Sequence, residues 1–417
     1  MKEELIKNRI RLSKMLENNS FAVIHSGYNK FKSADSVYDF FVNNNFYYLT
    51  NIDQANVILL VGNVNNHHFE KLFIESVDPE VAKWLGATLT HEEASELSGI
   101  AMQDILDINM FEKYTDSLYQ SNRYGLMEAH TVYLDLEYRD IPLYNTFGRV
   151  YAKTVRDRFP SVKIENCYNM IISLRMCKNE KEVALIKESI ETTKRAILNV
   201  MSHHNELSNE SIANAYHDFT IIKEGKTLSF NDIIASGHNA TVLHYDDNNS
   251  DILPNSLLLM DVGCYTKHYS SDITRTFPVN GKFTERQKEV YEVVLDTNKK
   301  CIEYATAGMS WKELNDYANN LLAKGLIKLG LIKDISELRK YYFHSIGHSL
   351  GLDVHDPSHA SEGLKEGMVI TIEPGLYIPE ESIGIRIEDN IMITKEKAIL
   401  LSKDIIKEVE DIENFLK

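Results

Sequence analysis

Residues 257–277 read LLLMDVGCYTKHYSSDITRTF, and the fold prediction starts from the two aspartates in this stretch, Asp261 and Asp272. An apolar run typical of a β-strand ends in Asp261, a polar segment follows, and an alternating run carries Asp272. If the two runs form an antiparallel hairpin that turns between Thr266 and Lys267, the aspartates lie opposite each other. Their Cβ atoms would then be about 5 Å apart on one face of the sheet.

Two ionised carboxylates held this close repel each other, and burial makes the repulsion worse, so a positive charge is needed between them. Arg275 falls on the opposite face of its strand and cannot supply it. A divalent cation is the natural counter-charge. The stretch therefore predicts a metal site built on a β-hairpin.

A second stretch repeats the pattern. Residues 368–391 read MVITIEPGLYIPEESIGIRIEDNI, in which Glu373 and Glu388 are centred on a polar turn. Between the two stretches, residues 344–356 read HSIGHSLGLDVHD and include His348. Four carboxylates and one histidine form a mostly oxygen ligand set with enough bridging carboxylates for two ions. Such a set suits Mn, Co, Fe or Zn in a paired site better than a structural zinc site.

Composition excludes several classes of protein. The 417 residues include 45 basic and 61 acidic side chains, which give a formal charge of −16 without a basic stripe. This charge argues against a nucleic-acid or anionic-membrane partner. The first ten residues are too charged for a signal peptide, and the apolar runs are too short to span a bilayer. Four scattered cysteines without a C-x-x-C pair indicate reduced thiols, so we expect a cytoplasmic protein.

The length suggests two domains, which we place at 1–165 and 166–417. Helical and strand-like segments alternate in the first, as in a small α/β domain. The expected helices cover 3–18, 92–97 and 145–158, and the expected strands cover 21–24, 46–49, 57–61 and 72–74.

In the second domain, three capping-box patterns predict long helices. They are Asn179 with Glu182, Thr284 with Gln287, and Ser310 with Glu313; a further helix is expected from Ser208 and a strand over 230–235. Helices followed by a carboxylate-bearing hairpin occur twice. We therefore expect an α+β catalytic domain made of two similar halves.

These motifs resemble those of the proline-specific "pita-bread" metallopeptidases, the group of Xaa-Pro aminopeptidase (aminopeptidase P) and prolidase. The resemblance covers about 180–400 and rests on MDVG, SDITRTF, GHSLGLDVHD, EPGLY and GIRIED, with all five ligands in the family's order. A softer similarity to the family's amino-terminal domain covers 29–52. Lys32 and Pro357 depart from the family pattern without touching a ligand.

The resemblance implies two divalent cations, Mn²⁺ first, with Co²⁺, Zn²⁺ or Fe²⁺ as alternatives. It assigns Asp261 to one cation and His348 to the other. Asp272 and Glu388 bridge both, and Glu373 binds the His348 cation and shuttles protons. A hydroxide shared by the cations would attack the scissile carbonyl.

Four more side chains are candidates near the cations. The resemblance places His244 and His355 beside the substrate, where they would hydrogen-bond the scissile carbonyl and shape the proline pocket. Arg386 and Tyr377 resemble residues that orient the ligands or line the pocket, and Arg386 shares a strand face with Glu388.

We therefore expect an Xaa-Pro aminopeptidase that acts on proline-containing peptides and assembles as a homodimer or homotetramer. The first alternative is a dipeptide-specific prolidase, which needs a cation that closes the pocket on the product carboxylate. The second is a non-catalytic peptide-binding module, although such proteins typically lose the ligands. Methionine aminopeptidase and creatinase activities are disfavoured, because the former needs no amino-terminal domain of this size and the latter needs no metal.

Overall fold

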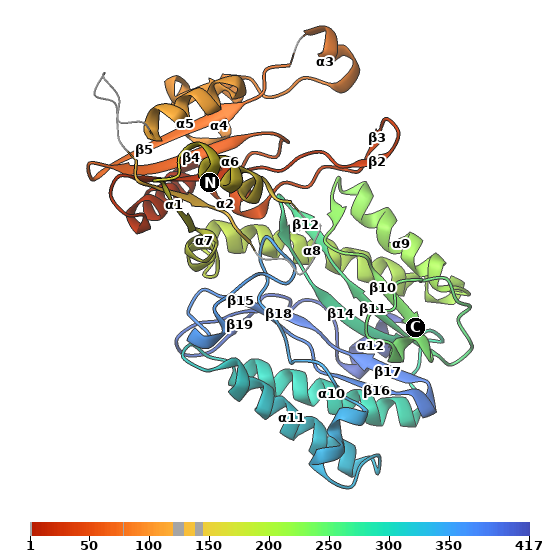
Figure 1. The fold of residues 1–417 in the computed structure, drawn as a ribbon. Coiled ribbons are helices and arrows are strands. Elements are labelled where there is room, and N and C mark those ends of the chain that lie inside the picture. Colours follow the sequence, from red (N-terminus) through yellow and green to blue (C-terminus); the bar gives the residue numbers. More distant parts are fainter. Residues whose placement is uncertain (1, 78, 120–128, 138–144) are drawn as a thin grey trace. The chain divides into compact units, whose positions relative to one another are not determined.

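The computed structural model describes residues 2–77, 79–119, 129–137 and 145–417. The chain divides into two compact units, Met1–Arg175 and Met176–Lys417 (Figure 1). Helix α7 (Tyr168–Arg175) belongs to the first unit, because Arg175 donates to Asn45 Oδ1 at 2.6 Å and Tyr48 donates to the Leu174 carbonyl at 2.8 Å. The compact units thus divide after α7, while the domain boundary expected between residues 165 and 166 stays a prediction.

The N-terminal unit is built on a mixed sheet with the strand order β6-β5-β4-β1-β7-β8. Strands β1 and β4 are antiparallel, whereas β7 runs parallel to both β1 and β8. Its strands are β1 (Ser20–His25), β2 (Phe31–Ser33), β3 (Ser36–Val37), β4 (Ile58–Val64), β5 (His67–Ile74), β6 (Ile105–Asp107), β7 (Thr131–Leu134) and β8 (Lys163–Asn166). Its other helices are α1 (Lys2–Met15), α2 (Asn44–Thr50), α3 (Pro79–Leu85), α4 (His91–Ser98), α5 (Phe111–Tyr119) and α6 (Phe147–Arg158).

One element of this unit differs from the prediction. Residues 46–49, expected as a strand, lie in helix α2. The Asn43 side chain caps the helix by accepting from the Phe46 amide, and Asn51 ends it in the left-handed conformation at φ 56°. All seven helical residues are buried, and a short, wholly buried apolar run has no periodicity that separates helix from strand.

The C-terminal unit combines long helices with small antiparallel sheets. Its helices are α8 (Glu180–Ser202), α9 (Glu210–Lys223), α10 (Glu285–Tyr304), α11 (Trp311–Lys328) and α12 (Val409–Phe415). Its strands are β9 (Thr227–Leu228), β10 (Ile233–Ser236), β11 (Leu257–Val262), β12 (Cys264–Thr266), β13 (Tyr269–Ser270), β14 (Ile273–Pro278), β15 (Val369–Ile372), β16 (Gly375–Ile378), β17 (Ile383–Arg386), β18 (Asp389–Met392) and β19 (Ile399–Leu400).

All three predicted capping boxes are present, at the N-termini of α8, α10 and α11. The helix expected from Ser208 begins at Glu210 with Asn209 as its cap. Helices α8 and α9 pack together, as do α10 and α11. Figure 1 shows α10 and α11 running side by side, with β16 and β17 above them. Each helix pair therefore accompanies one of the two carboxylate-bearing segments. Within the described residues, no helix is long and apolar enough to cross a membrane.

Candidate metal centre

The first aspartate hairpin forms, but its register differs from the predicted one. Asp261 on β11 lies opposite Thr274 of β14, two residues beyond Asp272. The cause is the turn, which is centred on Lys267 and His268, both in the left-handed conformation at φ 48° and 65°. Side chains alternate along a strand, so a shift of two residues keeps the face that each side chain occupies. Asp261 and Asp272 therefore still share a face, as diagonal rather than directly opposed neighbours.

The second hairpin has the predicted register. Gly375 pairs with Arg386 in the β16–β17 ladder, and Ile372 pairs with Asp389 in the β15–β18 ladder. Glu373 and Glu388 lie opposite each other in the gap between these ladders. The Ile387 amide donates to the Pro374 carbonyl at 3.2 Å, which continues the same pairing through the gap.

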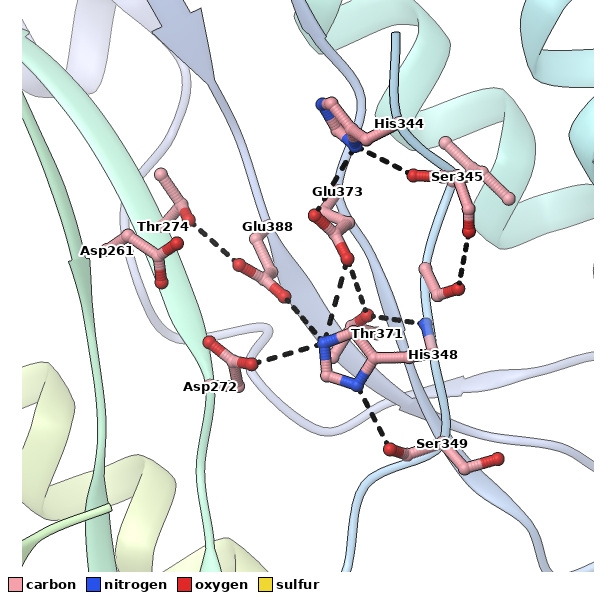
Figure 2. Close-up of polar contacts among 12 residues, drawn as sticks. Asp261, Asp272, Thr274, His344, Ser345, His348, Ser349, Thr371, Glu373 and Glu388 are labelled. Atoms are coloured by element: carbon pink, nitrogen blue, oxygen red, sulfur yellow. Dashed lines mark hydrogen bonds and ion pairs between the residues drawn. The ribbon is translucent and has the colours of Figure 1, made fainter. Parts of the chain in front are cut away.

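His348 connects the two hairpins (Figure 2). Its Nε2 lies 3.3 Å from Asp272 Oδ2, 3.6 Å from Glu373 Oε1 and 4.0 Å from Glu388 Oε1. Its Nδ1 lies 3.0 Å from the Ser349 carbonyl, an acceptor that fixes the proton on Nδ1. Nε2 is then free to act as a ligand, as in other histidine metal sites.

Threonine hydroxyl groups hold the side chains of Glu388 and Glu373 in place. Thr274 donates to Glu388 Oε2 at 2.8 Å, and Thr371 donates to Glu373 Oε1 at 3.4 Å (Figure 2). Thr371 Oγ1 also accepts from the His348 amide at 3.1 Å. Each contact starts from a strand or a neighbouring loop, so the ligand atoms are aimed by rigid backbone.

Arg386 supplies positive charge at the edge of the cluster. Its Nη2 donates to Asp261 Oδ2 at 2.5 Å, its Nη1 donates to Tyr377 Oη at 2.9 Å, and its Nε donates to Thr274 Oγ1 at 3.1 Å. Arg275 turns away, as expected, and pairs with Asp389 at 2.8 Å. One guanidinium thus faces four carboxylates.

The electrostatics of the cluster fit bound cations. Burial and neighbouring carboxylates raise the pKa values of Asp272 and Glu388 well above the usual range, and burial raises the pKa of Glu373 to about 7. Asp261 Oδ1 and Glu388 Oε1 are buried without a hydrogen-bond partner. Asp272, His348 and Glu388 each offer a ligand atom within 4.8 Å of the others. Unpaired carboxylate oxygens around a free imidazole nitrogen form a donor set for divalent cations.

The cluster opens into a cavity of about 780 Å³. His244, His344 and His355 line it together with the five predicted ligands. The His355 ring lies 4.1 Å from that of His348, centroid to centroid. Burial lowers the pKa of His355, and burial, with Arg386 nearby, lowers the pKa of His344 to about 4. Both rings are therefore neutral near pH 7.

Tyr377 and His344 occupy different places relative to the cavity. Tyr377 is not among the residues that line the cavity; it is fully buried behind it and joins Arg386 to His344, whose Nε2 lies 2.9 Å from its hydroxyl. His344 itself, which sequence reasoning left undecided, lines the cavity. The described lining residues that the sequence did not single out are Ser229, Phe230, Asn231, Ile233, Leu243, Asp246, Ser345, Gly347 and Val354. Only their closeness in sequence to the motif histidines gave a signal for some of them.

Comparison with known proteins gives this centre a context. Residues 184–395 match metallopeptidase family M24, and residues 5–126 match the aminopeptidase P N-terminal domain. The Xaa-Pro aminopeptidase of Haemophilus influenzae is 31% identical over 436 residues, covering 100% of this chain and 97% of the relative. The Escherichia coli Xaa-Pro aminopeptidase is 30% identical over 441 residues, covering 99% and 97%.

Solved structures agree over the whole length. A Bacillus anthracis protein described as a candidate aminopeptidase P is 43% identical, with a TM-score of 0.96 over 100% of this chain and 98% of that one. The low-pH form of E. coli aminopeptidase P is 28% identical, with a TM-score of 0.90 over 100% and 98%. The chain belongs to metallopeptidase family M24. Within this family, it has the fold of aminopeptidase P, with that enzyme's N-terminal domain preceding the catalytic domain. The predicted family, fold class and enzyme class are confirmed.

Proposed function

We propose that this chain is an Xaa-Pro aminopeptidase that removes the first residue from peptides with proline in the second position, using two divalent cations. The observation that carries the proposal is the meeting of five predicted ligands in one cavity, where buried carboxylate oxygens lack partners. Relatives that cover nearly the whole chain are Xaa-Pro aminopeptidases.

The two cations would be shared among five side chains. We assign Asp261 to one cation, His348 and Glu373 to the other, and Asp272 and Glu388 to both. Bound there, the cations would lower the pKa of a coordinated water and polarise the scissile carbonyl. We propose Mn²⁺ as the native ion because a mostly oxygen donor set accepts it readily. A zinc-substituted E. coli aminopeptidase P shows that one relative also takes zinc.

Glu373 is suited to move the proton. Without cations, burial raises the pKa of this carboxyl to about 7, and a bound cation would favour its ionised form, which can accept a proton. It can accept a proton from the attacking water and deliver it to the proline nitrogen as the peptide bond breaks. Thr371 holds one oxygen of Glu373 at 3.4 Å, and His344 Nδ1 lies 3.6 Å from the other.

The histidines on the cavity wall would act on the substrate carbonyl. His355 is neutral near pH 7 and keeps one N–H for donation. A hydrogen bond from His355 or His244 to the carbonyl oxygen would strengthen as negative charge develops there. Phe230, Leu243 and Val354 add an apolar wall against which a proline ring can pack.

The same cavity favours an aminopeptidase over a prolidase. Among the described residues that line it, Arg386 is the only arginine or lysine, and it already pairs with Asp261. A dipeptide product places a free carboxylate in the pocket, which needs a cation of its own. The described lining of the cavity offers no unpaired cation for that carboxylate, so the cavity suits a longer peptide better than a dipeptide.

Three further assignments are part of the proposal. We place the enzyme in the cytoplasm, assign it proline-containing peptides as its partners, and expect a homodimer or homotetramer. Cell fractionation and sedimentation velocity test the first and third.

The testing experiment uses metal-stripped full-length protein supplied with Mn²⁺, then with Co²⁺ or Zn²⁺. Release of arginine from Arg-Pro-Pro supports the proposal, whereas cleavage of Gly-Pro alone makes the chain a prolidase. His348→Ala, which removes one ligand, is the inactive control. If no peptide is cleaved with any cation but proline peptides bind, the chain is a binding module.

A further inference from the structure

The segment that carries His244 has little regular structure of its own. Residues 237–250, here called the His244 loop, connect β10 towards β11 and contain only a short 3₁₀ turn at Asn239–Thr241. His244 and Asp246 of this loop line the cavity. Something outside the loop must therefore fix the place of His244.

Glu210, the first residue of α9, lies beneath this loop with a fully buried side chain. Its Oε1 accepts from the Ser236 amide at 2.7 Å, the Ser236 hydroxyl at 2.9 Å and Asn239 Nδ2 at 3.1 Å. Its Oε2 accepts from the Tyr245 hydroxyl at 2.7 Å and the Ser250 amide at 3.0 Å. One buried carboxylate thus collects five donors from the start, middle and end of one segment.

Helix capping does not account for these contacts. Asn209 is the cap of α9 and accepts from the Ser211 amide at 2.9 Å. All five donors to Glu210 belong to residues 236–250, and its own amide donates back to the Ser250 carbonyl at 2.9 Å. A buried carboxylate is costly unless its oxygens are saturated with donors, and here the loop provides three of them and Ser236, at the end of β10, provides two. The side chain therefore orders the loop rather than the helix.

We propose that Glu210 is a positioning residue for the reaction, which holds His244 against the substrate by anchoring the residue next to it. Tyr245 follows His244 directly, and its hydroxyl has Glu210 Oε2 at 2.7 Å and Ser250 Oγ at 3.2 Å. With the Tyr245 hydroxyl held, the backbone that leads to His244 is restrained relative to the cavity. The inference rests on the proposed contact of His244 with the scissile carbonyl.

A second set of hydrogen bonds, made by Asn248, holds the end of the His244 loop. Asn248, at φ 46°, accepts from the Ile234 amide at 2.8 Å and donates to the Asp232 carbonyl at 2.7 Å. This anchor ties the end of the loop to β10 and does not involve Glu210. Removing the Glu210 contacts should therefore loosen the middle of the loop, around Tyr245, without releasing the whole segment.

Two variants test the proposal by removing different parts of the contact between Glu210 and the loop. Tyr245→Phe removes one bond to Glu210 and keeps the ring. Glu210→Gln replaces one acceptor oxygen with an NH₂ group, so the bond from at least one backbone amide, that of Ser236 or Ser250, is lost. The matched control is Tyr216→Phe. Tyr216 lies on the same helix α9, and its hydroxyl donates to the Glu206 carboxylate at 2.5 Å, a contact that does not involve the loop.

The readouts are kcat and KM per bound Mn²⁺, and amide hydrogen exchange of residues 236–250. We expect kcat to fall about tenfold in Tyr245→Phe and further in Glu210→Gln, with KM nearly unchanged, because the lost contact acts on the transition state. Exchange of the loop amides should rise in both variants. Tyr216→Phe should change neither quantity.

A double-mutant cycle with His244→Ala separates positioning from general damage. If Glu210 acts through His244, Tyr245→Phe lowers kcat no further once His244 is absent. Additive losses, or unchanged loop exchange in Glu210→Gln, overturn the proposal. If the wild-type protein cleaves no peptide, the proposed function fails, while the exchange measurement still decides whether Glu210 orders the loop.

Discussion

Glu373 should destabilise the metal-free protein as the pH rises. Burial raises the pKa of this carboxyl from 4.5 to about 7 in the folded chain. Between these two values the folded state binds more protons at Glu373 than the unfolded state does, so stability falls with increasing pH. A shift of about 2.5 pKa units corresponds to roughly 3 kcal/mol at 1.36 kcal/mol per unit. Below pH 4.5 the effect vanishes, and above pH 7 it is complete.

Glu373→Gln removes this titration because glutamine is neutral at every pH. Chelator-treated wild type and variant are unfolded in urea at pH 4.5, 6 and 8. We expect equal stability at pH 4.5 and a variant more stable by about 3 kcal/mol at pH 8, a difference of roughly 6 °C in melting temperature. Mn²⁺ should reverse the order, since it binds the carboxylate and stabilises only the wild type strongly.

The control is Glu292→Gln, a change at an exposed position on α10. It should leave the difference from wild type near zero throughout. A difference between wild type and Glu373→Gln that is independent of pH refutes the reasoning. So does a wild type that gains stability relative to the variant as the pH rises, because both results place the folded-state pKa of Glu373 at or below its ordinary value.

Three shorter predictions concern residues around the cavity. Asp272→Asn should lower turnover and bound Mn²⁺ at least about a hundredfold while leaving the circular dichroism spectrum unchanged; full activity would exclude a bridging role. Tyr377→Phe should cost about 1–2 kcal/mol in urea unfolding, whereas Tyr342→Phe should cost nothing because its buried hydroxyl has no hydrogen-bond partner; equal costs would contradict this. Lys178→Met should cost about 3–5 kcal/mol by removing the buried ammonium that neutralises Asp356, and adding Asp356→Asn should restore most of it; an unrestored double variant would show that the pair itself is not the cause.

The clustering of the five candidate ligands could be predicted because its signal is local. A carboxylate on each arm of a hairpin reports its face through the two-residue alternation of a strand, and like charges on one face require a cation. The register of the Glu373 hairpin was right because its arms are of equal length around the turn. The register of the Asp261 hairpin was wrong because the left-handed pair Lys267 and His268 moved the turn by one residue.

Other features depend on contacts that no local pattern contains. Helix α2 is fixed by the Asn43 cap and by burial on all sides, not by periodicity. Tyr377, expected either to orient the ligands or to line the pocket, lies behind the cavity wall, because its hydroxyl is taken by Arg386 and His344. Glu210 sits at the start of a helix, where acidic residues are common, and only the folded chain shows its five donors.

The charge balance of the centre explains why one guanidinium lies beside four carboxylates. With all four carboxylates ionised, Arg386 leaves the cluster three charges negative, which the raised pKa values of Asp272 and Glu388 show to be unfavourable. Two divalent cations, together with the hydroxide that they are proposed to share, would bring this to zero. A neutral buried centre opposes negative charge on a substrate carbonyl less than a negative one does. Arg386 would therefore do more than orient Asp261: without it the loaded centre would be one charge negative, and replacing it should cost transition-state stabilisation even if both cations stay bound.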